Sequence, residues 1–161
     1  MPNHVMNIVT FNSRIDEIRA FVKGTESPFD FESITPMPES VKASAGEPSD
    51  GLPEWYEWAC ANWGTKWNCY EVREIDNGFQ FLTAWATPCE VLGTLSERFP
   101  DVTITVQFAD EDLGNNCGRY ELNAGDMHDF TQLDDDYEFV CEVWGYEYTD
   151  VISSIEFNQE D

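Results

Sequence analysis

Short apolar segments with a two-residue period, or bounded by turn residues, predict four β-strands in the first 110 residues. Residues 102–108 give the clearest pattern, because four apolar side chains are separated by polar ones. Residues 5–11 carry apolar side chains in both phases and predict a strand that is covered on more than one side. Residues 67–75 and 79–86 are joined by Asp76-Asn77-Gly78, which is typical of a hairpin turn. One face of the last strand carries Phe79, Phe81, Thr83 and Trp85.

Three other segments repeat apolar residues every three or four positions, which predicts helices. The first follows Asn12 and Ser13, either of which is expected to cap it. The second covers residues 54–63, and the third begins with a predicted capping box at residues 87–90 and ends at Pro100. The apolar residues that define these helices are Ile15, Ile18 and Val22, then Trp55, Trp58, Ala59 and Trp63, then Leu92, Leu95 and Phe99.

Residues 25–53 are a looser segment that contains five of the eight prolines. Phe29, Phe31 and Ile34 alternate weakly, so they predict either a strand or a loop packed over the core. The middle of the segment, about residues 38–52, is expected to be a mobile insert.

The order of these elements predicts an α+β fold. Strand, helix, strand, strand, helix, strand is the ferredoxin-like split βαβ core, βαββαβ, here with an extra helix before the central hairpin. Residues 118–122 and 137–146 are predicted to add strands, with an acidic turn-like segment at 123–136. We therefore expect a core domain over residues 1–122 and an acidic C-terminal β extension over residues 123–161, packed on the same sheet.

The composition is that of a folded protein without disulfides. Aromatic residues make up 14% of the chain, whereas disordered acidic chains are poor in them. The five cysteines have no metal-type spacing, and an odd number without a signal peptide predicts reduced thiols in a cytoplasm. No apolar run approaches the roughly 20 residues that span a bilayer. We expect no membrane association, no metal and no cofactor.

Charge changes the picture most. The chain has 32 acidic and 8 basic residues, a formal net charge of -24. Residues 111–161 contain 15 of the acids and one base, Arg119. Because DNA carries one charge per ~1.7 Å of axis, such a surface could imitate nucleic acid, while direct nucleic-acid binding is disfavoured. Adaptation to salt, or solubility alone, is the competing interpretation.

Five sequence blocks resemble the YubB ferredoxin-like family of plasmid- and phage-encoded proteins. They are Pro2-Asn3-His4, residues 29–38, Trp63-Gly64-Thr65-Lys66-Trp67-Asn68, residues 81–88 and residues 109–114. The resemblance covers most of residues 1–122. It implies a ferredoxin-like fold, a mobile-element origin and a bacterial host, but no iron–sulfur cluster and no catalytic residues.

The acidic C-terminal third contains the candidate partner-binding residues. Read as a strand, residues 138–146 would present Glu138, Glu142 and Trp144 outward, where carboxylates steer a partner and aromatic rings anchor it. The full set is Asp126, Asp129, Asp134, Asp135, Asp136, Glu138, Glu142, Trp144 and Tyr146.

A candidate pocket is formed by Trp63, Lys66, Trp67 and Asn68, where a lysine and an amide between aromatic walls could bind an anion or a carbonyl group. The alternative is that the tryptophans fill the core. A carboxylate metal site at residues 110–112 and 134–136 is disfavoured, because consecutive acids on a strand point in different directions.

No catalytic or nucleotide-binding motif is recognisable. The sequence therefore favours a non-enzymatic cytoplasmic protein of a phage or plasmid that blocks a basic host nucleic-acid-binding or defence protein. The alternative is a small-molecule-binding or enzymatic domain with its site around residues 63–68. The oligomeric state and the identity of the partner are not indicated.

Overall fold

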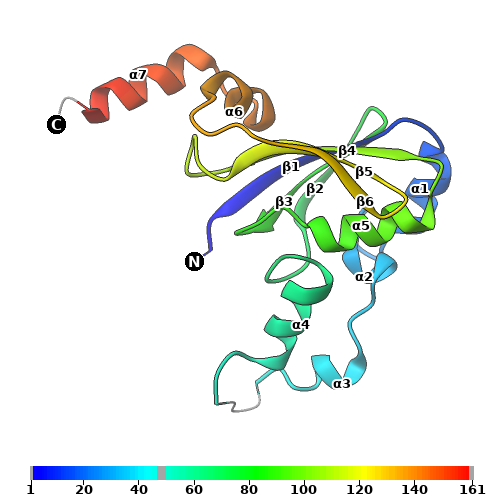
Figure 1. The fold of residues 1–161 in the computed structure, drawn as a ribbon. Helices are drawn as coiled ribbons and strands as arrows, with labels where there is room; N and C mark the ends of the chain where they lie inside the picture. The colour runs from blue at the N-terminus through cyan, green and yellow to red at the C-terminus, as the bar shows by residue number, and fades with distance from the viewer. Residues whose placement is uncertain (1, 47–49, 160–161) are drawn as a thin grey trace.

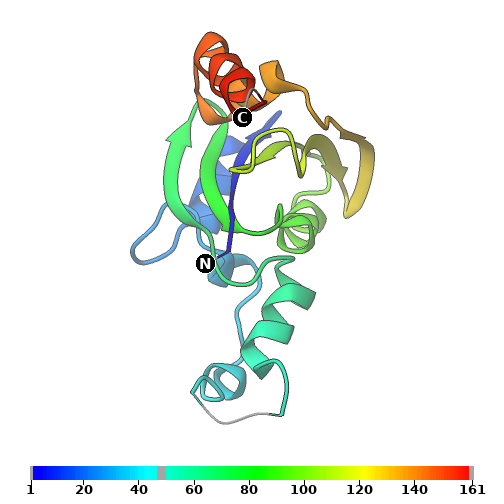
Figure 2. The same ribbon diagram turned by 90° about the vertical axis from the view of Figure 1, so that its left-hand side faces the viewer.

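The fold is a six-stranded sheet with helices on both faces (Figures 1 and 2). The computed structural model describes residues 2–46 and 50–159. Its sheet has the order β2-β3-β1-β4-β5-β6, and every neighbouring pair is antiparallel. The strands are β1 (His4–Phe11), β2 (Tyr70–Ile75), β3 (Gly78–Ala84), β4 (Thr103–Asp110), β5 (Cys117–Asn123) and β6 (Asp126–Gln132).

The helices lie mainly on one side of the sheet. Figure 1 shows α1, α2 and α5 below it, α3 and α4 projecting further down, and α6 above it, with α7 extending from α6 away from the sheet. Their bounds are α1 (Ile15–Val22), α2 (Phe31–Ile34), α3 (Glu39–Lys42), α4 (Glu54–Asn62), α5 (Cys89–Arg98), α6 (Tyr137–Trp144) and α7 (Tyr148–Gln159).

The main core lies between the sheet and α1, α2 and α5. Alternate residues of β1 and β4, such as Val9 and Val106, are fully buried there against Leu92 of α5. Gly78 lets β3 approach β1 closely, because a Cβ atom at this position would lie 1.9 Å from the carbonyl oxygen of Val9. The predicted ferredoxin-like α+β class is consistent with this architecture.

A second, smaller cluster covers part of the opposite face of the sheet. Phe139, Val140 and Val143 of α6 pack against Ala109 and Cys117, at one end of β4 and β5. The helix leaves open the part of this outer face that β4, β5 and β6 form around Gln107 and Arg119.

The predicted β extension is wrong beyond residue 132. The acidic segment 123–136, predicted to be turn-like, contains β6, and residues 137–146 form α6 rather than a strand. Residues 137–144 form a helix because both of its ends are capped. Asp136 caps the start of α6 by accepting a hydrogen bond from the Phe139 amide (3.1 Å), and Gly145 ends the helix in the left-handed conformation. Phe139, Val140 and Val143 then share its buried face.

Two predicted helix caps are also wrong. Arg14 occupies the N-cap of α1, and neither Asn12 nor Ser13 caps that helix. Asn12 instead accepts a hydrogen bond from the Thr103 amide (2.9 Å), which ties it to β4. At α5 the N-cap is Pro88, and the Thr87 hydroxyl pairs with the Tyr120 hydroxyl (2.7 Å) rather than with the helix.

The proline-rich segment packs on the core through a short helix. Phe29 and Phe31 are buried, and residues 31–34 form α2, so neither the strand nor the loop alternative describes them fully. Within the predicted mobile insert at 38–52, Glu39–Lys42 form α3, and residues 47–49 lie outside the described residues.

Candidate functional site: an acidic surface and an aromatic cluster

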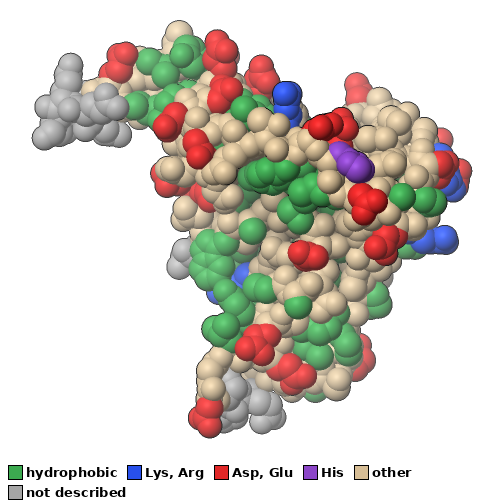
Figure 3. All heavy atoms as spheres, viewed as in Figure 1, with side chains coloured by type: hydrophobic (Ala, Val, Ile, Leu, Met, Phe, Trp, Pro, Cys, Tyr) green, Lys and Arg blue, Asp and Glu red, His purple; other side chains and the backbone are tan. Residues whose placement is uncertain are grey.

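The acidic residues proposed to bind a partner lie on β6, on the loop that follows it, and on α6. Eight of the nine candidate residues are exposed, while Trp144 is half-buried. Figure 3 shows acidic side chains around α6 and the start of α7, and along the part of the molecule near β6. Together with exposed Glu147 and Asp150, they give this part of the molecule an excess of negative charge.

None of these carboxylates is paired with a cation in the described part of the chain. The five ion pairs found there involve Arg14, Arg19 and Lys42, whose acidic partners all lie within residues 17–101. The described acids of the C-terminal third therefore present their charge without an ion-pair partner.

Two members of the acidic set have structural roles that sequence reasoning missed. Asp136 is the N-cap of α6. Asp135 lies in the left-handed region (φ 59°), and its carboxylate accepts a hydrogen bond from the Tyr137 hydroxyl (3.2 Å). These contacts constrain which residues can be replaced in a test of binding.

The helical form of α6 changes which side chains face outward. Glu138 and Glu142 are four residues apart, so they share the exposed face of the helix, as predicted for these two. Trp144 does not join them. Its indole nitrogen donates to the Asp110 carbonyl (3.2 Å), and its ring stacks on exposed Tyr146 at 5.8 Å. A shallow hollow of about 340 Å³ between α6 and α7 is lined by Glu138, Cys141, Glu142, Tyr146 and Tyr148.

The acids also affect a buried thiol. Burial raises the pKa of Cys117 to about 11, and the charges of Asp134, Asp136 and Asp135 add to this effect. The Cys117 thiol therefore stays protonated at neutral pH, and it donates to the Leu133 carbonyl (3.2 Å) at the start of the acidic loop.

The four residues of the predicted pocket fall into two groups. Trp63 is buried in the core, and its indole nitrogen donates to the Thr35 carbonyl (2.8 Å). Asn68 organises α2, because it accepts from the Phe31 amide (3.0 Å) and donates to Asp30 (2.7 Å). These two contacts are structural.

Lys66 and Trp67 belong instead to an aromatic cluster on the surface. The Lys66 ammonium group lies 4.6 Å from the ring centroid of Trp67, 4.9 Å from that of Trp85 and 5.8 Å from that of Tyr56. Trp67 is 38% exposed and Trp85 is 46% exposed. In the described residues Lys66 makes no ion pair. Figure 3 shows hydrophobic side chains gathered on the side of the molecule near α4.

Trp85 departs from the predicted face of β3. Phe79, Phe81 and Thr83 are buried as a set, but the strand ends at Ala84 and Trp85 adopts a left-handed φ of 67°. Its amide donates to the Asn3 carbonyl and its carbonyl accepts from the Asn116 side chain, each at 2.9 Å. Sequence reasoning had no signal for this turn.

A buried carboxylate holds the turn in place. Asp110 is 6% exposed and accepts hydrogen bonds from the side chains of Asn3 and Asn116 (both 3.1 Å) and from the Asp112 amide (2.9 Å). In the described residues, no group of three or more His, Cys, Asp and Glu side chains is placed to hold a metal ion. Asp110 thus has a positioning role for the surface that carries Trp85.

The architecture is that of a ferredoxin-like protein, and comparison with known proteins gives the family. The family model described as a ferredoxin-like domain in Api92-like protein matches residues 62–151, more than half of the chain, so the chain belongs to this family. The ferredoxin-like fold predicted from the sequence is thereby confirmed, whereas the resemblance to the YubB family stays a prediction.

Other comparisons are sparse. The crystal structure of a protein api92 from Yersinia pseudotuberculosis is similar to 63% of this chain, at 18% sequence identity and a TM-score of 0.49. The matched part spans 38% of that protein. No curated protein matches the chain. Among the described residues, no helix combines the length and the apolar character that crossing a membrane requires.

Proposed function

We propose that this protein is a non-enzymatic binding protein whose acidic C-terminal surface imitates nucleic acid and blocks a basic partner. The observation that carries the proposal is the set of exposed carboxylates on β6, the 133–136 loop and α6, which have no cationic partner among the described residues. Unpaired charge on one part of the surface repels itself and weakens the fold. A basic partner would relieve that repulsion on binding.

The same surface has the other feature of a protein interface. Phe130, Tyr146 and Tyr148 are about half exposed, at 50%, 48% and 46%, and lie among the acids. The few residues that dominate binding energy in interfaces are enriched in Trp, Tyr and Arg, whereas charge governs the rate of encounter and the choice of partner. This combination supports a protein partner rather than a small cation.

Several finer points belong to the same proposal. The resemblance to the YubB family suggests a phage or plasmid origin, a site of action in the bacterial cytoplasm, and a host nucleic-acid-binding or defence protein as partner. We also propose that β1–β4 with α1 and α5 are the split βαβ core, which the strand order β2-β3-β1-β4 supports.

The test reverses the charge of acidic residues that are chosen for their exposure and for the absence of a structural role. Asp126, Asp134, Glu138 and Glu142 are exposed, and none caps a helix or has a left-handed φ, so all four are replaced by Lys. Asp135 and Asp136 are retained for their structural roles. The control reverses four exposed acids elsewhere, namely Asp16, Glu26, Glu57 and Asp76, none of which has a left-handed φ, and gives the same net charge.

Tagged protein is used to capture partners from host lysate, with elution in rising salt and competition by duplex DNA. We expect one basic nucleic-acid-binding protein, displaced by DNA, captured by the control variant and lost from the first variant. Equal capture by both variants would show that net charge, not this surface, determines binding. Capture of assorted basic proteins would indicate that the charge serves solubility.

The Lys66 cluster supports a second candidate function, a ligand-binding site for an anion or a carbonyl group. The specific observation is that the Lys66 ammonium group faces three rings and has no carboxylate partner in the described residues. Screening of metabolite mixtures by ligand-observed NMR, with Lys66→Met and Lys23→Met compared, tests it. Binding that is lost only in Lys66→Met supports the site, and equal binding by both variants contradicts it.

A further inference from the structure

The part of the outer sheet face that α6 leaves open contains a hollow of about 450 Å³. Its walls are cross-strand neighbours: Thr105 and Gln107 of β4 lie opposite Glu121 and Arg119 of β5, and Thr131 of β6 lies opposite Arg119. The complete lining is Thr105, Gln107, Arg119, Tyr120, Glu121, Asp129 and Thr131. Its volume lies within the range of about 300–1,000 Å³ that small-molecule sites occupy, and its lining is mainly polar and charged.

A β-bulge shapes the hollow. The register between β5 and β6 shifts between Arg119 and Glu121, so that Asp129 and Phe130 of β6 stand against one residue of β5. Asp129 adopts a left-handed φ of 53° at this point. The bulge bends the edge strand and brings Asp129 to the same hollow as Arg119.

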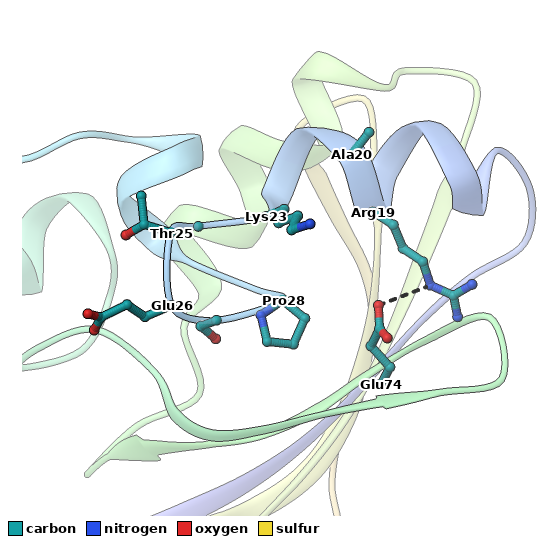
Figure 4. Close-up of a pocket in the computed structure, with 9 residues that line it drawn as sticks. Arg19, Ala20, Lys23, Thr25, Glu26, Pro28 and Glu74 are labelled. Carbon is teal, nitrogen blue, oxygen red and sulfur yellow. Dashed lines mark ion pairs between the residues drawn. The ribbon is translucent and has the colours of Figure 1, made fainter.

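The charged groups around this hollow do not pair with one another. Arg119 lies in one hollow with Glu121 and Asp129, yet none of these side chains forms an ion pair or a side-chain hydrogen bond within the described residues. The hollow beside α1 is different, since Arg19 there forms an ion pair with Glu74 (3.8 Å; Figure 4). Arg19 also donates a hydrogen bond to the Ile75 carbonyl (3.0 Å). A guanidinium and two carboxylates that line one hollow without pairing leave binding capacity for a third molecule.

We infer that this hollow binds a small zwitterion that carries a carboxylate and an ammonium group, of which a free amino acid is the simplest. The Arg119 guanidinium would donate two parallel hydrogen bonds to the carboxylate. Glu121 and Asp129 would accept from the ammonium group, and the Gln107 amide and Thr105 hydroxyl would orient the ligand. One cation and two anions in the lining favour such a ligand over a simple anion, which the carboxylates repel. This site goes beyond the proposed protein partner and does not depend on it.

The experiment is an NMR titration of the isotope-labelled full chain with each of the twenty free L-amino acids. Acetate and methylammonium serve as the two half-ligands. We expect one or a few amino acids to shift the backbone amides of residues 105–107, 119–121 and 129–131 in a saturable way, and the half-ligands to bind at least about tenfold more weakly.

Two variants and a matched control complete the test. Arg119→Gln and Glu121→Gln should each weaken binding by at least about tenfold. Arg73→Gln replaces an exposed strand arginine far from the hollow and should leave binding unchanged. Absence of saturable shifts, equal binding by acetate, or full binding by Arg119→Gln would each overturn the inference. None of these outcomes bears on capture of a protein partner, which is read from separate variants.

Discussion

At the scale of single residues, the structure shows how one buried carboxylate supports an exposed ring. A left-handed φ at a non-glycine residue such as Trp85 costs free energy and persists only where neighbouring groups hold it. The Trp85 amide donates to the Asn3 carbonyl, and the Trp85 carbonyl accepts from the Asn116 side chain. The side chains of both asparagines also donate to the Asp110 carboxylate, which fixes their positions. Strain retained beneath an exposed aromatic ring is consistent with a functional role for the Lys66 cluster.

Replacing Asp110 with Ala should lower the free energy of unfolding by about 1–3 kcal/mol, because three donors lose their acceptor. The control is Asp112→Ala, which removes the same charge from a residue that accepts a hydrogen bond from the exposed Asn115 side chain. Urea unfolding measures both. Equal losses in the two variants would contradict a special role for Asp110.

The five cysteines should differ sharply in reactivity with a thiol reagent at neutral pH. Cys60 is exposed, whereas burial raises the pKa of Cys69 far above its ordinary value and that of Cys117 to about 11. We therefore expect rapid modification at Cys60 and slow modification of Cys69 and Cys117 until the protein unfolds. Mass spectrometry of digested samples assigns the sites. Rapid labelling of Cys117 would mean that the acidic loop opens in solution.

At the scale of elements, sequence patterns predicted the strands and helices whose apolar period was strong. The four strands of the first 110 residues and α1, α4 and α5 were all predicted within a few residues of their observed bounds. The segment 137–146 was not, because its apolar residues fit a two-residue and a helical period almost equally well over so short a length. Asp136 and Gly145 were the local signals that favour the helix.

The candidate sites were predictable to a smaller extent. The acidic surface follows from composition, since a run of acids without bases has to be solvated. The Lys66 cluster could not be assembled from sequence, because Tyr56, Lys66 and Trp85 come from three separate segments that the fold brings together. The Arg119 hollow depends on a bulge whose place is set by the pairing of β5 with β6.

The cap of α6 gives a prediction at this scale. Asp136→Ala should lower the free energy of unfolding by about 0.5–2 kcal/mol, because the Phe139 amide loses its acceptor. Asp136→Asn removes the same charge but keeps a capping oxygen, so most of the stability should remain. Chemical denaturation of the two variants distinguishes the contribution of the capping hydrogen bond from that of the Asp136 charge. If both were equally stable, the cap would contribute nothing measurable.

At the scale of the whole molecule, the distribution of charge lowers the stability of the fold, because like charges are concentrated in the C-terminal third. All five ion pairs of the described residues lie in the first 101 residues, whereas the described C-terminal acids form none. A molecule with net charge -24 is repelled by a second copy of itself and attracted to cationic surfaces. This asymmetry is what a partner of opposite charge would exploit, and it makes the thermal stability of the free protein sensitive to salt.

We therefore expect the melting temperature to rise steadily as salt increases from about 0.01 M to 1 M, because the Debye length falls from about 30 Å to about 3 Å. The variant with Asp126, Asp134, Glu138 and Glu142 reversed should melt at a higher temperature in low salt and respond less to added salt. The control reversal of Asp16, Glu26, Glu57 and Asp76 should respond more than this variant, because it leaves the C-terminal charge intact. Scanning calorimetry across salt concentrations distinguishes these outcomes.

A cooperative fold that appears only near molar salt would favour adaptation to salt over imitation of nucleic acid. A fold already stable at low salt, with repulsion concentrated in the C-terminal third, would favour a surface retained for binding.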